Sequence, residues 1–214
     1  MDKLVLVLGM HRSGTSTLTG VLHRMGLPIG DNLMKPSKDN PKGYYENMDF
    51  YKVNEQILEN CNSKWYDVDN VFNDDILLTD LNRDVLRDVI LKYEGYDTFG
   101  VKDPRVCVLL PLYEQVCKEL DIDIVYISNR RDDSSIIKSI SKRDGHNEKR
   151  ISKLIEQHRM RIHKKDYEMV YEDLINHTEE EVRKLSDKFP FLHTGRMDDI
   201  LQFVDPTLNR NKRG

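Results

Sequence analysis

The segment LVLVLGMHRSGTS, residues 4–16, decides the fold. Its first five residues are a continuous apolar run that ends at Gly9, which is typical of a central parallel strand with both faces buried. From Thr15 onward, apolar residues recur at helical spacing until Gly26 ends the pattern. The segment therefore predicts a buried strand, a glycine-containing loop and a helix, in that order.

The rest of the chain alternates between expected strands and helices. Strands are expected over 98–101, 122–128 and 168–171, and helices over 50–60, 80–93 (with Asp80 as N-cap), 109–120, 134–143, 148–164 and 179–189. Residues 27–47 are expected to form a loop, and the last twenty residues look irregular. Because strands that alternate with helices form parallel sheets covered on both faces, we predict one α/β domain over residues 1–214, with a three-layer α/β/α architecture and a central parallel sheet.

The composition limits the classes of function. The chain has 214 residues, of which 38% are hydrophobic and 33% charged, and a formal net charge of −4, which argues against general nucleic-acid binding. Cys61, Cys107 and Cys117 are far apart and lack metal-type spacing, as expected of ordinary thiols in a reducing compartment. The first apolar run is too short for a membrane span or a signal peptide, so we expect a soluble, cytoplasmic protein.

The loop after the first strand has the pattern of a phosphate-binding loop. Two glycines five residues apart, Gly9 and Gly14, stand between a strand and a helix, where backbone N–H groups converge on an anion. A nucleoside triphosphatase would have lysine directly after the second glycine, but here that residue is Thr15, and the cation comes earlier, at Arg12. This pattern favours a single phosphate-like group over a triphosphate tail.

This loop resembles the 5′-phosphosulfate loop of sulfotransferases that use 3′-phosphoadenosine 5′-phosphosulfate (PAPS), a family with a P-loop NTPase-like fold. The resemblance implies that the loop residues bind this group of PAPS: His11, Arg12, Ser13, Gly14, Thr15 and Ser16. From the residues alone, packing beside the donor is the favoured role of His11.

A second anion site follows from the same resemblance. The family binds the 3′-phosphate of PAPS with an arginine at a strand end and a serine eight residues later, which here selects Arg131 and Ser139. The alternative is that Arg130 and Arg131 only pair with the neighbouring Asp132 or Asp133. Many sulfotransferases close this pocket with a basic C-terminal segment, which makes Arg210 and Lys212 further candidates; a solvated tail is the alternative reading.

Sulfuryl transfer needs a base for the acceptor proton and a cation for the leaving oxygen. Segments 41–47, 102–105 and 171–174 also resemble bacterial members of the family. We expect Glu46 to be the base, with Asp103 as the alternative, and Arg12, then Lys102, to supply the positive charge. Glu46 could instead pair structurally with Arg105. The family's usual histidine base is replaced by Pro104. Protein cations can suffice for a sulfuryl group, so no metal is required.

These observations predict an enzyme that transfers a sulfuryl group from PAPS to a hydroxyl or amine and releases PAP (3′-phosphoadenosine 5′-phosphate). The expected acceptor is a small molecule or an exposed glycan or lipid, with Trp65, Tyr66, Tyr44 and Tyr45 as candidate pocket residues. Two alternatives remain open: a P-loop small-molecule kinase that uses ATP, and a non-catalytic protein that binds PAPS or PAP. No nucleic-acid partner and no membrane span are expected.

Overall fold

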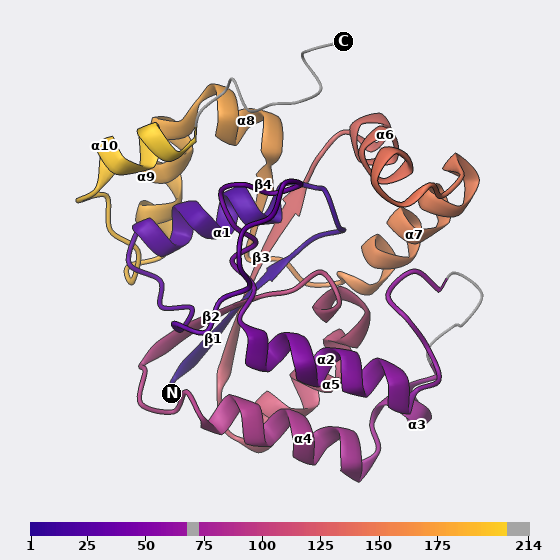
Figure 1. Cartoon of the computed structure of the whole chain (residues 1–214). Coiled ribbons are helices and arrows are strands. Elements are labelled where there is room, and N and C mark those ends of the chain that lie inside the picture. Colours follow the sequence, from indigo (N-terminus) through magenta and orange to yellow (C-terminus); the bar gives the residue numbers. More distant parts are fainter. Residues whose placement is uncertain (68–72, 205–214) are drawn as a thin grey trace.

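Four parallel strands form the central sheet in the part of the chain that the computed structural model describes, residues 1–67 and 73–204 (Figure 1). The strand order is β2-β1-β3-β4, and the strands are β1 (Lys3–Leu8), β2 (Thr98–Lys102), β3 (Asp123–Arg130) and β4 (Tyr167–Val170). The apolar run of β1 is buried between two neighbours, with Val5 opposite Gly100 of β2 and Val125 of β3. A continuous apolar sequence is what a strand with two buried faces requires.

Helices cover both faces of the sheet, which confirms the predicted three-layer α/β/α architecture (Figure 1). Leu4, Leu6 and Leu8 of β1 pack in a core with the helices α2 (Met48–Asn60), α4 (Asp80–Leu91) and α5 (Val106–Glu119). Val5 and Val7 face the opposite core, formed with α1 (Thr15–Arg24), α8 (Tyr171–Asn176), α9 (Thr178–Lys188) and α10 (Met197–Phe203). The alternation of side chains along β1 therefore divides the core into two halves.

Two further helices pack together near the carboxyl ends of the strands. They are α6 (Asp133–Asp144) and α7 (Glu148–Arg161), and their small apolar cluster includes Met10 of the loop after β1. In Figure 1 they lie on the other side of the strand ends from α8 to α10. The short helix α3 (Asp74–Leu77) packs against α5. Because all four described strands are parallel, the segments that follow them meet at one edge, where α/β sheets usually bind ligands.

Several local predictions were wrong, and the helix expected over 148–164 ends at Arg161. Residues 197–203 form α10, although the last twenty residues looked irregular; Ile200 and Phe203 are its buried residues, and a seven-residue helix is too short to give a clear periodic signal. The last expected strand ends at Val170, because Tyr171 begins α8. The N-cap of α4 is Thr79, whose hydroxyl accepts the N–H of Asn82, and not Asp80.

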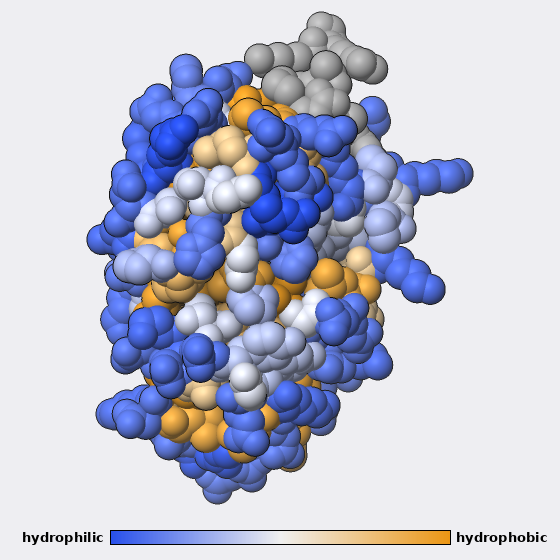
Figure 2. Space-filling view, turned by 90° about the vertical axis from the view of Figure 1, so that its left-hand side faces the viewer, coloured by the Kyte–Doolittle hydropathy of each residue, from blue (hydrophilic) through white to orange (hydrophobic). Residues whose placement is uncertain are grey.

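The outer surface carries few large apolar side chains. The face in Figure 2 is mostly hydrophilic, with hydrophobic residues in small separate patches. Within residues 1–67 and 73–204, no helix combines the length and apolar character needed to cross a bilayer.

Candidate functional site

A cavity of about 700 Å³ opens at the carboxyl edge of the sheet. Residues at or just after the carboxyl end of each of the four strands line it, including Arg12, Lys102, Arg131 and Tyr171, together with part of segment 34–46. Its lining holds eight lysine and arginine residues and three carboxylates: Arg12, Lys42, Lys102, Arg105, Arg131, Lys138, Lys142 and Arg143, with Asp39, Glu46 and Asp144. A basic cavity in an acidic chain favours an anionic ligand.

Contacts from two other elements hold the loop between β1 and α1 in place. The N–H of Gly9 donates to Sγ of Cys107 on α5 at 3.1 Å, and Nδ2 of Asn129 on β3 donates to the carbonyl of Ser13 at 2.8 Å. Burial raises the pKa of Cys107 to about 12, so this thiol stays neutral at pH 7. Neither anchor was predicted from the sequence, in which the local signal is a polar asparagine at the end of a buried strand.

Gly14 joins the loop to α1. Its φ of +94° lies in the left-handed region, and a Cβ on this residue would come within 2.1 Å of Cδ2 of Tyr171. No side chain of the described residues caps the N-terminus of α1. The first N–H groups of the helix are thus available to an anion, with the favourable end of the helix dipole behind them.

The two predicted anion sites are in direct contact. Nε of Arg12 donates to Oγ of Ser139 at 2.9 Å, and Nη1 of Arg131 donates to the carbonyl of Arg12 at 3.0 Å. The guanidinium of Arg131 also lies 4.4 Å from the ring centre of Tyr171. The fold therefore brings together Arg12 with Arg131 and Ser139, which are more than a hundred residues away along the chain.

The neighbouring aspartates have other roles. Asp132 caps α6 by accepting the N–H of Ser135, and Asp133 forms an ion pair with Arg159 of α7. Arg130 lies 3.8 Å from Glu168 and is largely exposed.

A buried ion pair lies beside the loop. Nζ of Lys102 donates to Oε1 of Glu46 at 2.6 Å, to the carbonyl of Tyr44 at 3.1 Å and to Oγ of Ser16 at 3.3 Å. Lys102 is 4% exposed and Glu46 6%. Burial raises the pKa of Glu46 above its ordinary value, although the positive charge of Lys102 opposes this shift.

Asp103, the alternative base, is fully engaged. Its carboxylate accepts from Nδ2 of Asn54 at 3.0 Å, and from the backbone N–H and Nη1 of Arg105 at 2.9 and 2.8 Å. Arg105 also forms an ion pair with Glu55, so the expected structural pairing of Arg105 with Glu46 is replaced by pairs with Asp103 and Glu55. Of the two candidate bases, only Glu46 lines the cavity.

Lys102→Met is expected to lower the free energy of unfolding by about 3 kcal/mol at pH 7, because it leaves the buried carboxylate of Glu46 without a counter-charge. A raised native pKa means that the native state binds this proton more tightly than the unfolded state. The loss should therefore shrink as the pH falls and be smallest below pH 4.5, where Glu46 is mostly protonated in both states. Urea unfolding at several pH values measures it. Lys138→Met, on the exposed rim, is the control and should change stability by less than about 0.5 kcal/mol.

Aromatic side chains line the end of the cavity near His11. The imidazole of His11 lies 4.2 Å from the Trp65 ring, and burial, then the positive charge of Arg105, holds its pKa well below the ordinary range. Tyr44, Tyr45 and Trp65 line the cavity as expected, and Tyr51, which was not predicted, lines it too.

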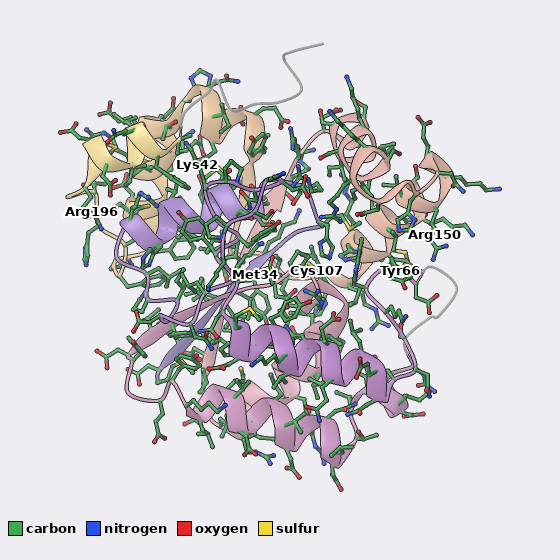
Figure 3. All side chains as sticks on the ribbon, in the orientation of Figure 1. Met34, Lys42, Tyr66, Cys107, Arg150 and Arg196 are labelled. Atoms are coloured by element: carbon green, nitrogen blue, oxygen red, sulfur yellow. The ribbon has the colours of Figure 1, made fainter. Side chains whose placement is uncertain are left out.

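Tyr66 is not among the residues that line this cavity. Its carbonyl accepts from Nη2 of Arg150 of α7, a neighbour that Figure 3 shows beside it.

The segment between α1 and α2 forms one wall of the cavity. Met34 and Lys42, labelled in Figure 3, belong to it, and Nζ of Lys42 donates to the carbonyl of Phe203 of α10. Nη1 of Arg12 donates to the carbonyl of Asp39 at 3.3 Å, which joins this wall to the loop. Arg210 and Lys212 lie outside the described residues.

Comparison with known proteins finds no family model and no curated protein that matches this chain.

Proposed function

We propose that this protein is a PAPS-dependent sulfotransferase. The observation that carries the proposal is the direct contact between Arg12 of the phosphate loop and the Arg131–Ser139 pair, in a cavity rich in cations. PAPS carries two separate anionic groups, a 5′-phosphosulfate and a 3′-phosphate, and two adjacent anion sites suit such a ligand. Guanidinium groups are well adapted to both because they form bidentate, charge-assisted hydrogen bonds.

In the proposed reaction the acceptor oxygen or nitrogen attacks the sulfur atom in line with the bridging oxygen of the phosphosulfate. The new bond to sulfur forms as the bond from sulfur to the bridging oxygen breaks, and the electron pair of the broken bond stays on PAP. Arg12 and the N-terminus of α1 stabilise that negative charge. The acceptor proton goes to Glu46, whose raised pKa makes it a stronger base than an ordinary carboxylate.

The role of Lys102 follows from its contacts. It holds one carboxylate oxygen of Glu46 at 2.6 Å and reaches Ser16 of the loop at 3.3 Å, so it connects the proposed base with the proposed donor site. A positive charge at this point can orient Glu46 and share the charge that develops on the leaving group. Thr15 at the position of the triphosphatase lysine argues against the ATP-dependent alternative.

Thermal unfolding in the presence of PAP, or of ATP with Mg²⁺, tests the proposal. A ligand at a hundred times its Kd stabilises the native state by about 2.7 kcal/mol, which for a chain of this size raises Tm by about 5–10 °C. We expect PAP to give this shift and ATP with Mg²⁺ to give less. Arg12→Ala should abolish the PAP shift, whereas Arg130→Ala, at the exposed neighbouring arginine, should keep it.

A larger shift with ATP and Mg²⁺ than with PAP would contradict the proposal in favour of a kinase. A PAP shift without transfer of label from ³⁵S-PAPS to any acceptor in a broad panel would favour the non-catalytic PAP-binding protein instead.

A further inference from the structure

A second cavity, of about 380 Å³, lies between β3, α6 and α7. Gly9, Met10 and Ser13 border it, whereas His11 and Arg12 line the first cavity, so different residues of the same loop face the two spaces. The proposed sulfuryl transfer leaves this space without a role.

One polar wall of this second cavity is His158 of α7. Its Nδ1 lies 2.8 Å from the carbonyl of Leu154, and a carbonyl can only accept, so Nδ1 carries the proton. Burial lowers the pKa of His158 to about 4, which keeps the ring neutral at pH 7. Nε2 is therefore a hydrogen-bond acceptor; the residue is 1% exposed, and this atom has no partner among the described residues.

The second polar wall is Asn129 of β3. Its Nδ2 donates to the carbonyl of Ser13, and this bond fixes the orientation of the amide. Oδ1 is then an acceptor on a residue that is only 6% exposed, and it too lacks a partner within the described part of the chain. A buried acceptor without a partner costs about 1–3 kcal/mol. Two such atoms, on residues that line the same cavity, favour a ligand that donates hydrogen bonds.

The remaining walls add two properties. Ile136, Ile155 and Ile162 are apolar, which suits a flat or aliphatic body. The lining has one carboxylate, Glu168, and four basic residues: Arg130, Arg131, Arg159 and Lys165. Lys165 and Arg130 share Glu168, Arg159 pairs with Asp133, and Arg131 lies 4.0 Å from Glu172, so the four cations face three carboxylates and keep one net positive charge. An anionic group on the ligand would complement this charge.

We propose that this cavity is a second ligand site, and that it takes a small organic anion whose other end carries N–H donors. The donors pair with Nε2 of His158 and Oδ1 of Asn129, the apolar body packs between the isoleucines, and the anion lies near the arginine and lysine side chains. Asn129 also donates to the carbonyl of Ser13 and so anchors the phosphate loop. A ligand in this site would therefore contact that anchor directly.

NMR titration of the native, ¹⁵N-labelled protein with 4-aminobenzoate tests this proposal. The probe has about ten non-hydrogen atoms, an amine at one end and a carboxylate at the other, and for its size we expect a Kd of about 1 mM. The shifts should concentrate on the side-chain amide of Asn129 and the backbone amides of Met10, Ser13 and Ile155. Benzoate, which has the same ring and carboxylate without the donors, should bind about fivefold more weakly.

Two histidine variants test whether His158 binds the amine of the probe. His158→Phe should reduce the affinity for 4-aminobenzoate to that for benzoate, whereas His163→Phe, at an exposed histidine just beyond α7, should leave both affinities unchanged. Three results would overturn the proposal: no saturable shifts up to about 10 mM probe, equal affinity for probe and benzoate, or shifts confined to the first cavity. The comparison of the two probes on the native protein decides the matter even where His158→Phe fails to fold.

Discussion

Glu46→Gln is expected to slow sulfuryl transfer by about 10²- to 10⁴-fold, the usual contribution of a general base, while the Kd of PAP changes by less than about twofold. Glutamine has nearly the same shape as glutamate and keeps an oxygen that accepts from Nζ of Lys102, but it takes up no proton at neutral pH. A base that acts only on the acceptor contributes to the transition state and not to donor binding. Steady-state kinetics with PAPS, together with calorimetric titration of PAP, measures both quantities.

The pH profile gives a second readout for the same variant. The raised pKa of Glu46 means that the native enzyme should lose activity as the pH falls through that pKa, at a value above the ordinary 4.5, because the protonated carboxyl cannot accept the acceptor's proton. The acid limb should be missing from the residual activity of Glu46→Gln.

Glu55→Gln is the matched control. Glu55 is a carboxylate of α2, paired with Arg105 at the surface and 38% exposed in its side chain, and it does not line the cavity. The rate of sulfuryl transfer by Glu55→Gln should stay within about twofold of the native rate. If Glu46→Gln and Glu55→Gln lose the same amount of transfer activity, the loss reflects negative charge near Arg105 and not a general base at Glu46.

The first strand, the loop and the helix after it could be predicted because their signal is local. An unbroken apolar run, a glycine and a helical repeat follow one another in residues 4–26, and each pattern has one dominant structural meaning. The parallel sheet followed from the alternation of such units. The approach of Arg131 to Arg12 needed only this topology, since both residues follow neighbouring strands, β3 and β1.

The anchors of the loop and the partner of Glu46 could not be predicted because they depend on long-range packing. Cys107 is 98 residues from Gly9, and Asn129 is 116 residues from Ser13, so no periodicity connects them. For Glu46, the basic segment at the end of β2 offers two possible partners, Lys102 and Arg105. The three-dimensional packing determines which of them pairs with Glu46. Lys102 is opposite Val7 in the sheet, near Ser16, whereas Arg105 pairs with Asp103 and Glu55.

A loss of stability as large as that of Lys102→Met is expected for Gly14→Ala. The new Cβ would lie 2.1 Å from Cδ2 of Tyr171, and alanine would have to adopt a φ of +94°. The left-handed conformation alone costs about 1–2 kcal/mol, and displacement of the buried ring adds to it, so we expect the free energy of unfolding to fall by about 3 kcal/mol. Urea unfolding measures this loss.

Gly145→Ala separates backbone strain from the contact with Tyr171. Gly145 also has a left-handed φ, of +70°, but nothing lies within 4 Å of the position of its Cβ. Alanine there should cost only about 1 kcal/mol and leave PAP binding unchanged. An equal loss of stability in both glycine variants would mean that the ring of Tyr171 yields easily to the new methyl group.

Gly14→Ala should also weaken PAP binding about 100-fold, equivalent to about 3 kcal/mol, because the ring of Tyr171 supports the guanidinium of Arg131, which lies 4.4 Å from the ring centre. A displaced ring moves Arg131, and Arg131 holds the carbonyl of Arg12, so one methyl group disturbs both proposed anion sites. Combining Gly14→Ala with Tyr171→Ala removes the clash; the double variant should be more stable than the sum of the single effects by about 1–2 kcal/mol. Strict additivity would mean that the packing of Tyr171 on Gly14 does not hold the two sites together.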